Sequence, residues 1–426
     1  MFFGILHVNG RRSKEMLPET NIFNLPNDHL GSGRSVAFVH SGAFSHANQS
    51  LLAALQRQFA HDPQLRDVRF AVLDLMPIVR NSREILLANL VHVYREFGHD
   101  ILTKRKSFQR AFYATTYLFR KRSELAARFV ASAPRLFSMQ TQSLFDASTP
   151  GVPHFLYTDH TMLANLHYPD VQSRQTLGVS EKWLRMERSL YNKATANFTM
   201  SLNISRSISE DYGCTPAQVV LALAGGNVAE AVVPHHKDYT KKNILFVGMD
   251  WARKGGPQLV EAFRRVRRQH PDAQLTVVGC SPPVNLPGCR VVGHVPKAEV
   301  AKYYDEATLF CMPTRLEPFG FVFLEAMQHG LPLVATNIGA IPDFLHHGRN
   351  GYLSEPNDVD GLANALCRLL DDPQKRQQFG QQSVQMVQPY NWDNVARIMT
   401  ETIQQHIVVA PTAHTIPVAQ EMMQPA

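Results

Sequence analysis

The chain has 426 residues, of which 44% are hydrophobic and 19% are charged, so it is long enough for two or three domains with sizeable cores. Its formal net charge of +7 comes from dispersed basic residues, a pattern that permits attraction to anionic ligands but does not indicate a nucleic-acid partner. Five cysteines without a Cys-x-x-Cys pair argue against a zinc or disulfide framework, and no apolar run approaches the roughly 20 residues of a membrane-spanning helix, so we expect a cytoplasmic protein.

The two ends of the chain lack the periodicity of regular structure. Residues 1–33 contain Pro18, Pro26 and the run Gly31-Ser32-Gly33, which predicts an irregular N-terminal extension. The same lack of periodicity predicts a flexible tail over residues 408–426. The first residues have no basic region and no small-residue cleavage site, so we expect no signal peptide.

Between these ends, short apolar runs alternate with helical patterns, which predicts an α/β protein with two Rossmann-like parallel-sheet domains. The first domain is expected over residues 34–240, with strands near residues 36–40, 68–74, 154–157, 198–201 and 219–222. The second is expected over residues 241–388, with strands near residues 244–247, 275–279, 290–292, 309–312 and 333–336. Ligands of such sheets bind at the carboxyl ends of the strands, so we expect a cleft between the two domains.

Polar residues follow two predicted strands of the first domain. Asp159 and His160 come directly after the strand at residues 154–157, which places them at the expected edge of the cleft. A purely structural role, with each side chain satisfied by local hydrogen bonds, stays open for both. The loop at residues 41–44 also follows a strand, the first one, and has one glycine.

The segment Lys104–Arg128 carries eight basic residues against one acid, and its aromatic residues fall on one helical face: Phe108, Phe112 and Phe119. Two interpretations stay open. The helix could touch anionic lipid, which would make the protein peripheral at the inner membrane face. Alternatively, its charges are solvated while its rings enter the domain core, and the clustering of the charges at both ends of the helix favours this interpretation.

Residues 317–325 of the second domain, Glu-Pro-Phe-Gly-Phe-Val-Phe-Leu-Glu, follow an apolar run that resembles a buried strand. Pro318 suits a first helical position and Gly320 allows close approach to the backbone, so Glu317 is expected in the loop and Glu325 on the second helical turn. The N–H groups of a helix start bind anions, and a carboxylate further along the helix can accept hydrogen bonds from vicinal hydroxyls. We therefore expect a ligand with a phosphate and a ribose.

This segment resembles the Glu-x7-Glu signature of the retaining family 4 glycosyltransferases, which have the two-domain GT-B fold. Residues 248–255, Gly-Met-Asp-Trp-Ala-Arg-Lys-Gly, are similar to the family's diphosphate-binding Gly-Arg…Lys-Gly segment. Further segments in the family's order are residues 277–279, 293–295 and 348–352. One departure is Met249, which stands where the family has its first arginine, and whether Arg253 replaces that charge stays open.

The resemblance implies a role for each matching residue. Glu325 would bind the ribose hydroxyls, Glu317 the donor sugar, and Lys254 the diphosphate. The remaining nucleotide-side residues would be Arg253, the backbone of Gly320, Phe321 and Val322, and His294. His160 and Asp159 would lie near the donor sugar and the acceptor. The helical stripe at residues 389–407 would cross back onto the N-terminal domain.

The expected activity is therefore transfer of a sugar from a nucleoside diphosphate sugar to an acceptor hydroxyl on a glycan, lipid or small molecule, with retention at the anomeric carbon. We expect no required metal or other cofactor, because Lys254 and a helix start would already stabilise the departing diphosphate. A phosphorylase would need a pyridoxal-binding lysine, and a dinucleotide-dependent oxidoreductase would need Gly-x-Gly-x-x-Gly after the first strand; neither is evident. A non-catalytic sugar-nucleotide-binding or scaffold subunit stays open because of Met249.

Overall fold

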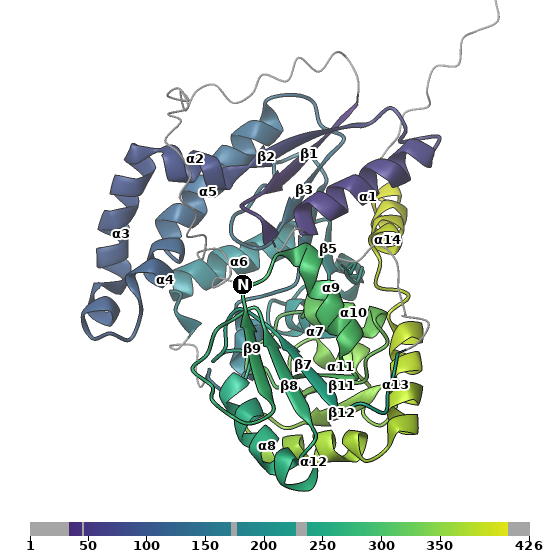
Figure 1. Ribbon diagram of the computed structural model, residues 1–426. Coiled ribbons are helices and arrows are strands. Elements are labelled where there is room, and N and C mark those ends of the chain that lie inside the picture. The colour runs from purple at the N-terminus through teal and green to yellow at the C-terminus, as the bar shows by residue number, and fades with distance from the viewer. Residues whose placement is uncertain (1–33, 45–46, 172–176, 227–236, 408–426) are drawn as a thin grey trace, which may run out of the picture.

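The computed structural model describes residues 34–44, 47–171, 177–226 and 237–407, and it contains two six-stranded parallel sheets, one in each half of this part of the chain (Figure 1). The strands of the N-terminal sheet are β1 Ser35–His40, β2 Arg69–Asp74, β3 Phe137–Thr141, β4 His154–Thr158, β5 Ala196–Thr199 and β6 Val219–Leu221. Those of the C-terminal sheet are β7 Asn243–Val247, β8 Gln274–Val278, β9 Cys289–Gly293, β10 Leu309–Met312, β11 Leu333–Thr336 and β12 Gly351–Ser354. The predicted pair of Rossmann-like domains is confirmed.

Helices connect the strands and cover the sheets. The N-terminal half contains α1 Ala47–His61, α2 Leu75–Asn81, α3 Arg83–Leu102, α4 Phe108–Tyr113, α5 Thr116–Ala131, η2 Leu163–His167, α6 Glu181–Lys193, α7 Leu202–Glu210 and η4 Pro216–Gln218. The C-terminal half contains α8 Gly256–Gln269, α9 Lys297–Glu306, α10 Phe321–Gln328, α11 Ile341–Phe344, α12 Val359–Leu370, α13 Pro373–Met386 and α14 Trp392–Gln404. Apolar side chains from both faces of the sheets form the cores, because parallel strands are buried on both sides.

The strand order locates a switch point in each sheet. The N-terminal order is β2-β1-β3-β4-β5-β6, so the chain goes from β1 to one side and then returns to the other side at β3. The C-terminal order is β12-β11-β10-β7-β8-β9, which puts the switch between β7 and β10. Loops leave a parallel sheet in opposite directions at such a point, so ligands bind there. The loops after β7 and β10 carry the two motifs found in the sequence.

Two strands had not been predicted, β3 and β12, and β3 is a central one. Its sequence, Phe-Ser-Met-Gln-Thr, has polar residues that are nevertheless buried. Ser138 Oγ bonds His154 Nδ1 at 2.8 Å, and Gln140 Nε2 donates to the carbonyls of Gln142 and Phe145, both at 2.8 Å. These specific hydrogen bonds remove the cost of burying the polar groups, so hydrophobic periodicity does not reveal the strand.

The segment Lys104–Arg128 does not form the single helix that had been expected. The chain breaks between α4 and α5, where the Thr115 side chain caps α5 by accepting from Leu118 N. Phe119 is buried against Trp183 with ring centroids 5.6 Å apart, whereas Phe108 is exposed. Arg122 is buried too, and burial lowers its pKa to about 10. The three phenylalanines therefore do not share one helical face, because they lie on two separate helices, α4 and α5, with different orientations.

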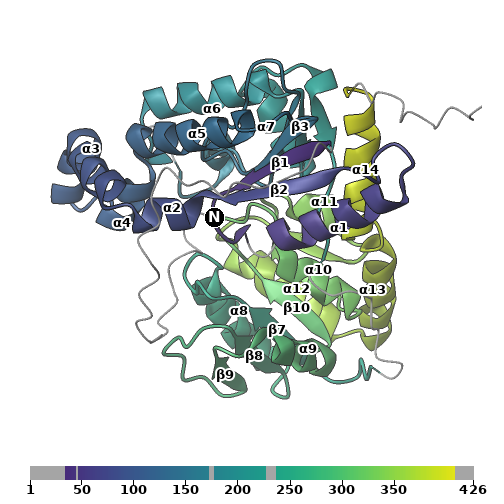
Figure 2. The same ribbon diagram turned by 90° about the horizontal axis from the view of Figure 1, so that it is seen from above.

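The last helix lies against the N-terminal half. Both views show α14 beside α1 (Figures 1 and 2). Arg57 of α1 forms an ion pair with Asp393 at 2.6 Å, and Gln404 Nε2 donates to Asp62 Oδ2 at 2.7 Å. Residues 1–33 and 408–426, for which an extension and a tail were predicted, lie outside the described residues.

Candidate functional site

The loops after β7 and β10 pack backbone against backbone at the switch point of the C-terminal sheet. Gly255 is the N-cap of α8 with φ +76°, and a Cβ at this position would overlap the carbonyl oxygen of Pro313. The amide of Arg315 donates to the carbonyl of Arg253 at 2.8 Å. Only glycine combines the positive φ with this close approach, so Gly255 sets the distance between the two loops.

Lys254 and Glu317 form an ion pair at this junction, one from each loop. Both side chains are buried. Burial lowers the pKa of Lys254, while the neighbouring Glu317 carboxylate acts in the opposite direction. A buried pair of this kind compensates two charges that would each be costly alone. The two residues proposed for the diphosphate and the donor sugar are thus each other's partners in this structure.

Residues of the N-terminal half also hold the Glu317 loop. Tyr168, which follows η2, donates from its hydroxyl to the backbone carbonyl of Glu317 at 2.9 Å. Arg315 forms a bidentate ion pair with Asp170. Gly339 leaves room for this arrangement, because a Cβ there would overlap the Glu317 carbonyl. The candidate site therefore lies where the two domains meet, and sequence reasoning did not find Tyr168.

The helix α10 begins beside this pair. Gly320 is its N-cap with φ +100°, and a Cβ there would lie 2.8 Å from a ring carbon of Phe323 and 3.2 Å from Glu317 Cγ. The first amides of the helix, including Phe321 and Val322, have no carbonyl four residues earlier within the helix, so they suit an anion. Pro318 had been expected at the first helical position, but it lies in the loop because Gly320 starts the helix.

Glu325 lies on the second turn of α10, as the sequence predicted. The hydroxyl of Tyr304, from α9, donates to Glu325 Oε2 at 3.0 Å. The Glu325 carboxylate raises the pKa of Tyr304 further above its ordinary value, in the direction of the larger effect of burial. Tyr304 was not identified from the sequence, since a tyrosine in an amphipathic helix gives no sign of its partner.

Arg253 faces the neighbouring loop in this structure. Its guanidinium donates to the carbonyl of Leu316 at 2.7 Å and forms an ion pair with Asp250 at 3.4 Å. Met249, at the position of the expected arginine, is 67% exposed. Arg253 thus helps to shape the Glu317 loop, and its charge is already matched by Asp250.

His294 lies further along the same edge of the C-terminal sheet, after β9, and is exposed. The amide of Gly279 donates to the carbonyl of Gly293 at 2.8 Å. A Cβ on Gly279 would lie 2.9 Å from the carbonyl oxygen of Gly248. The loops after β7, β8 and β9 are therefore in contact in that order, which places His294 at the rim and Lys254 at the centre.

Asp159 and His160 follow β4 on the N-terminal side. Asp159 is buried, and its Oδ1 has no hydrogen-bond partner among the described residues. Burial raises the pKa of Asp159 to about 7, and the charge of Glu317 acts in the same direction. His160 Nε2 bonds Asn165 Oδ1 at 2.9 Å, and burial lowers the His160 pKa to about 4, so this imidazole is neutral at pH 7.

A buried network positions the loop that carries His160. Glu187 of α6 accepts from Ser143 Oγ at 2.7 Å and from Met162 N at 3.3 Å. The hydroxyl of Tyr191 donates to the His160 carbonyl at 3.2 Å. Burial raises the pKa of Glu187 to about 7. None of these residues stood out in the sequence, because each is a single polar residue in an otherwise ordinary helix or loop.

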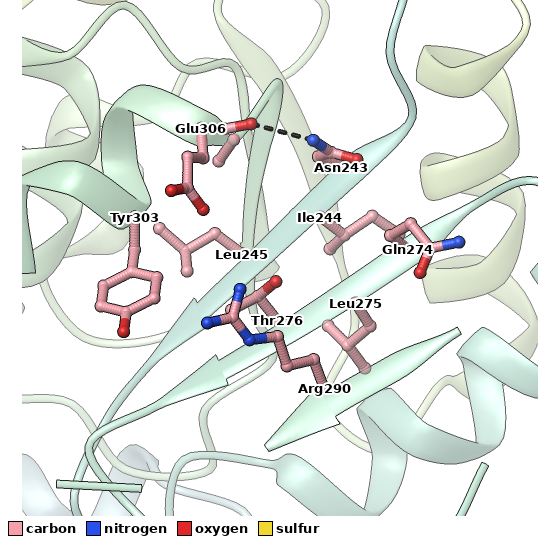
Figure 3. A pocket seen from close by; sticks show the side chains of 10 residues that line it. Asn243, Ile244, Leu245, Gln274, Leu275, Thr276, Arg290, Tyr303 and Glu306 are labelled. Atoms are coloured by element: carbon pink, nitrogen blue, oxygen red, sulfur yellow. Dashed lines mark hydrogen bonds between the residues drawn. The ribbon is translucent and has the colours of Figure 1, made fainter. Parts of the chain in front are cut away.

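A separate pocket of about 200 Å³ lies at the other end of the C-terminal sheet (Figure 3). It is lined by the first residues of β7 and β8 together with Arg290, Tyr303 and Glu306. The carboxyl ends of the strands, where Lys254 and Glu317 lie, face away from it. Within the described ranges, no group of three or more His, Cys, Asp or Glu side chains could hold a metal ion.

Comparison with known proteins gives a family match for part of the chain. Residues 241–372 match the model of the family "Glycosyl transferases group 1". The chain is 30% identical over 237 residues to glycogen synthase from Mycobacterium tuberculosis, covering 53% of this chain and 56% of that protein. The match thus spans about half the length of this relative, and the family match includes both loops of the candidate site.

Two solved structures share the fold. Sucrose-phosphate synthase from Thermosynechococcus elongatus superposes with a TM-score of 0.58 at 20% identity, over 87% of this chain and 98% of that one. A mutant of TarM from S. aureus, solved in complex with Fondaparinux, alpha-GlcNAc-glycerol and UDP, gives a TM-score of 0.54 at 14% identity, over 66% and 59%. At these identities the likeness establishes the GT-B architecture alone.

Proposed function

We propose that the protein is a retaining family 4 glycosyltransferase that moves a sugar from a nucleoside diphosphate sugar to an acceptor hydroxyl. The observation that carries the proposal is the Lys254–Glu317 pair at the switch point, with the start of α10 beside it and Glu325 one turn further. A cation, a helix start and a carboxylate in this order match a diphosphate followed by a ribose. The similarity to glycogen synthase supports the same reaction class.

In this proposal the donor opens the Lys254–Glu317 pair. The diphosphate brings its own negative charge, so it replaces Glu317 as the partner of Lys254 and receives hydrogen bonds from the amides of Phe321 and Val322. Glu317 is then released towards the hydroxyls of the donor sugar. Because Lys254 is buried, its charge acts on the departing diphosphate with little screening, and this stabilises the leaving group.

The nucleoside would be held by Glu325, which accepts from the ribose hydroxyls after displacing Tyr304. On the opposite side, Asp159 and the neutral His160 would face the donor sugar and the acceptor. No protein nucleophile is required if the leaving phosphate accepts the proton of the attacking hydroxyl on the same face of the sugar. The acceptor could then be a glycan, a lipid or a small molecule with a free hydroxyl.

Calorimetry with UDP, GDP, ADP and their nucleosides tests the proposed donor site. Glu325→Ala should weaken both the preferred nucleoside diphosphate and its nucleoside by roughly 10- to 150-fold, since a hydrogen bond to a charged group contributes about 1.5–3 kcal/mol. The double variant Lys254→Ala/Glu317→Gln, which leaves no unpaired charge, should weaken the diphosphate and spare the nucleoside. Unchanged diphosphate affinity in both variants would remove the basis for this site.

A non-catalytic sugar-nucleotide-binding subunit is the second candidate, and Met249 with the engaged Arg253 favours it. Both candidates predict nucleotide binding, so binding alone does not separate them. The two candidates are separated by an assay for hydrolysis or transfer of the sugar from the donor that calorimetry identifies. Activity that falls in Glu317→Gln while nucleoside diphosphate affinity is kept or increased would support the transferase, and binding without any turnover would support the subunit.

A further inference from the structure

The helix α3 has two apolar faces, of which only one is used inside the protein. Its inner face, Ile85, Asn89, Val93 and Phe97, is buried against the neighbouring helices. The opposite face carries Leu87, Val91, Tyr94 and Leu102, exposed by 64%, 51%, 61% and 83%. These four residues, the outer stripe, follow helical spacing with Gly98 between them. A helix that only covers a domain needs one apolar face, so the outer stripe is unexplained by the fold.

The outer stripe concentrates the apolar surface of the molecule. Among the described residues, five of the eight exposed large hydrophobic side chains lie between residues 87 and 108. The fifth is Phe108 of α4, whose ring centroid is 6.3 Å from that of Tyr94. Both views show α3 projecting at the outer edge of the N-terminal half (Figures 1 and 2). Apolar residues gathered at a projecting edge indicate a docking surface.

The charges around the outer stripe are almost all positive. The exposed charged residues of α3 and the turn after it are Arg83, Arg95, Lys104 and Arg105 against Glu84. The other acids of this helix face inward, where Glu96 accepts from Thr116 N at 3.1 Å. Burial lowers the pKa of the half-buried Lys106 to about 8, and the nearby Asp100 carboxylate opposes this shift. A negatively charged partner therefore complements this surface.

We propose that the outer stripe of α3, with Lys104 and Arg105 at its end, docks on an anionic lipid bilayer. Apolar side chains of moderate size flanked by basic residues are what an interfacial helix presents to headgroups and acyl chains. A symmetric contact between two copies of the chain would bring Arg83, Arg95 and Lys104 against like charges, which opposes self-association. The helix lies on the membrane, because no helix in the described part of the chain combines the length and apolarity needed to cross one.

The helix α4, which follows the docking surface in the chain, approaches the loop after β7. Arg110 of α4 is within electrostatic reach of Asp250, in the loop after β7, because the Asp250 carboxylate opposes the lowering of the Arg110 pKa by burial. Docking through α3 would bring α4, and with it the loop after β7, towards the lipid surface. If the proposed transfer is correct, a lipid-borne acceptor is the class this placement suits, but the docking itself does not depend on that activity.

Vesicle sedimentation of the full chain tests the docking. Vesicles of phosphatidylcholine with an equal share of phosphatidylglycerol should recover the protein, pure phosphatidylcholine should recover much less, and about 1 M salt should release it, since screening then acts within about 3 Å. The variant Lys104→Gln/Arg105→Gln should bind about 30-fold more weakly, at roughly fivefold for each basic residue. The matched control Arg264→Gln/Arg268→Gln removes two exposed charges from α8 and should bind as the wild type does.

The apolar part of the surface is tested by Leu87→Ser/Val91→Ser, which should weaken binding about tenfold or more, with the exposed Leu202→Ser as the control. All four side chains of the stripe are exposed, so the variants should fold, and circular dichroism verifies this. Equal recovery of the stripe variant and the wild type would overturn the proposal. So would absence of vesicle binding together with a dimer in sedimentation velocity that the stripe variant abolishes.

Discussion

On the C-terminal side of the candidate site two loops are in contact through their backbones, whereas on the N-terminal side polar side chains hold the loops. Gly255 allows the backbones of the loops after β7 and β10 to come into contact, because a Cβ there would overlap the Pro313 carbonyl. By contrast, the loop that carries His160 is held by Glu187, Tyr191 and Asn165. Backbone packing leaves a local mark in the sequence, because only glycine tolerates it, while side-chain networks join residues far apart in the chain. The comparison therefore predicts different sensitivities to substitution on the two sides.

The largest effect is expected at Gly255. In Gly255→Ala the new Cβ would overlap the Pro313 carbonyl at a positive φ, so we expect destabilisation of more than about 4 kcal/mol. Gly213→Ala is a matched control, because Gly213 has a similar φ of +78° but no atom within 4 Å of the added Cβ. The control should cost only about 1–2 kcal/mol. Urea unfolding of both variants measures the difference, and equal losses would show that the two loops are not in such close contact.

The second effect concerns the buried pair in the same loops. Lys254→Ala leaves the Glu317 carboxylate buried and unpaired, which should destabilise the protein by about 3–5 kcal/mol. Adding Glu317→Gln should recover most of this loss, since the remaining group is neutral. A double-mutant cycle in urea gives the coupling. If the double variant is no more stable than Lys254→Ala, the pair is not formed as described.

On the N-terminal side, Glu187 should make stability depend on pH. Burial raises the pKa of Glu187 from 4.5 to about 7, so between these values the folded state binds a proton that the unfolded state has lost. Its contribution to stability is therefore present below pH 4.5 and is lost as the pH rises through about 7. The total loss is about 3 kcal/mol. Urea unfolding of the wild type and of Glu187→Gln from pH 4.5 to 7.5 tests this. The free energy of unfolding of the wild type should fall with rising pH relative to that of the variant. Parallel dependences of the two free energies on pH would contradict the burial of a titrating carboxyl here.

A smaller effect is expected at Tyr304, whose hydroxyl is hydrogen-bonded to the Glu325 carboxylate, the group proposed to bind the ribose. Tyr304→Phe removes the hydrogen bond to Glu325, so nucleoside binding no longer has to break it. We expect a gain in nucleoside affinity of about 2- to 10-fold, from a net contribution of about 0.5–1.5 kcal/mol. Calorimetry measures it. A loss of affinity would instead mean that the Tyr304 hydroxyl itself contacts the ligand.

No change is expected on removing divalent metal ions. In the proposed reaction Lys254 and the start of α10 stabilise the diphosphate, so transfer should keep its rate in the presence of a chelator. The assay uses whichever donor calorimetry identifies. Loss of activity that magnesium or manganese restores would show that the protein groups are not sufficient.

The residues themselves show why some of this was predictable. Glu317, Gly320 and Glu325 lie within nine consecutive positions, so the strand, turn and helix that place them are local events. Ser138 and Gln140 of β3 are the opposite case, because their burial depends on partners that the pattern of β3 does not contain. The segment Lys104–Arg128 was wrongly predicted as one helix for a related reason: the Thr115 cap that divides it is a single ordinary residue.

The amino-acid sequence by itself determined the two parallel sheets, the positions of most strands along the chain, and the loops that carry Lys254 and Glu317, because these follow from periodicity and from the glycines of the turns. Only the tertiary structure decided which side chains are partners. In the folded protein Lys254 forms an ion pair with Glu317, and the Tyr304 hydroxyl donates a hydrogen bond to Glu325. The Tyr168 hydroxyl donates to the backbone of the Glu317 loop. Such pairs depend on how separate loops and domains are placed in space, and no spacing along the chain encodes that distance.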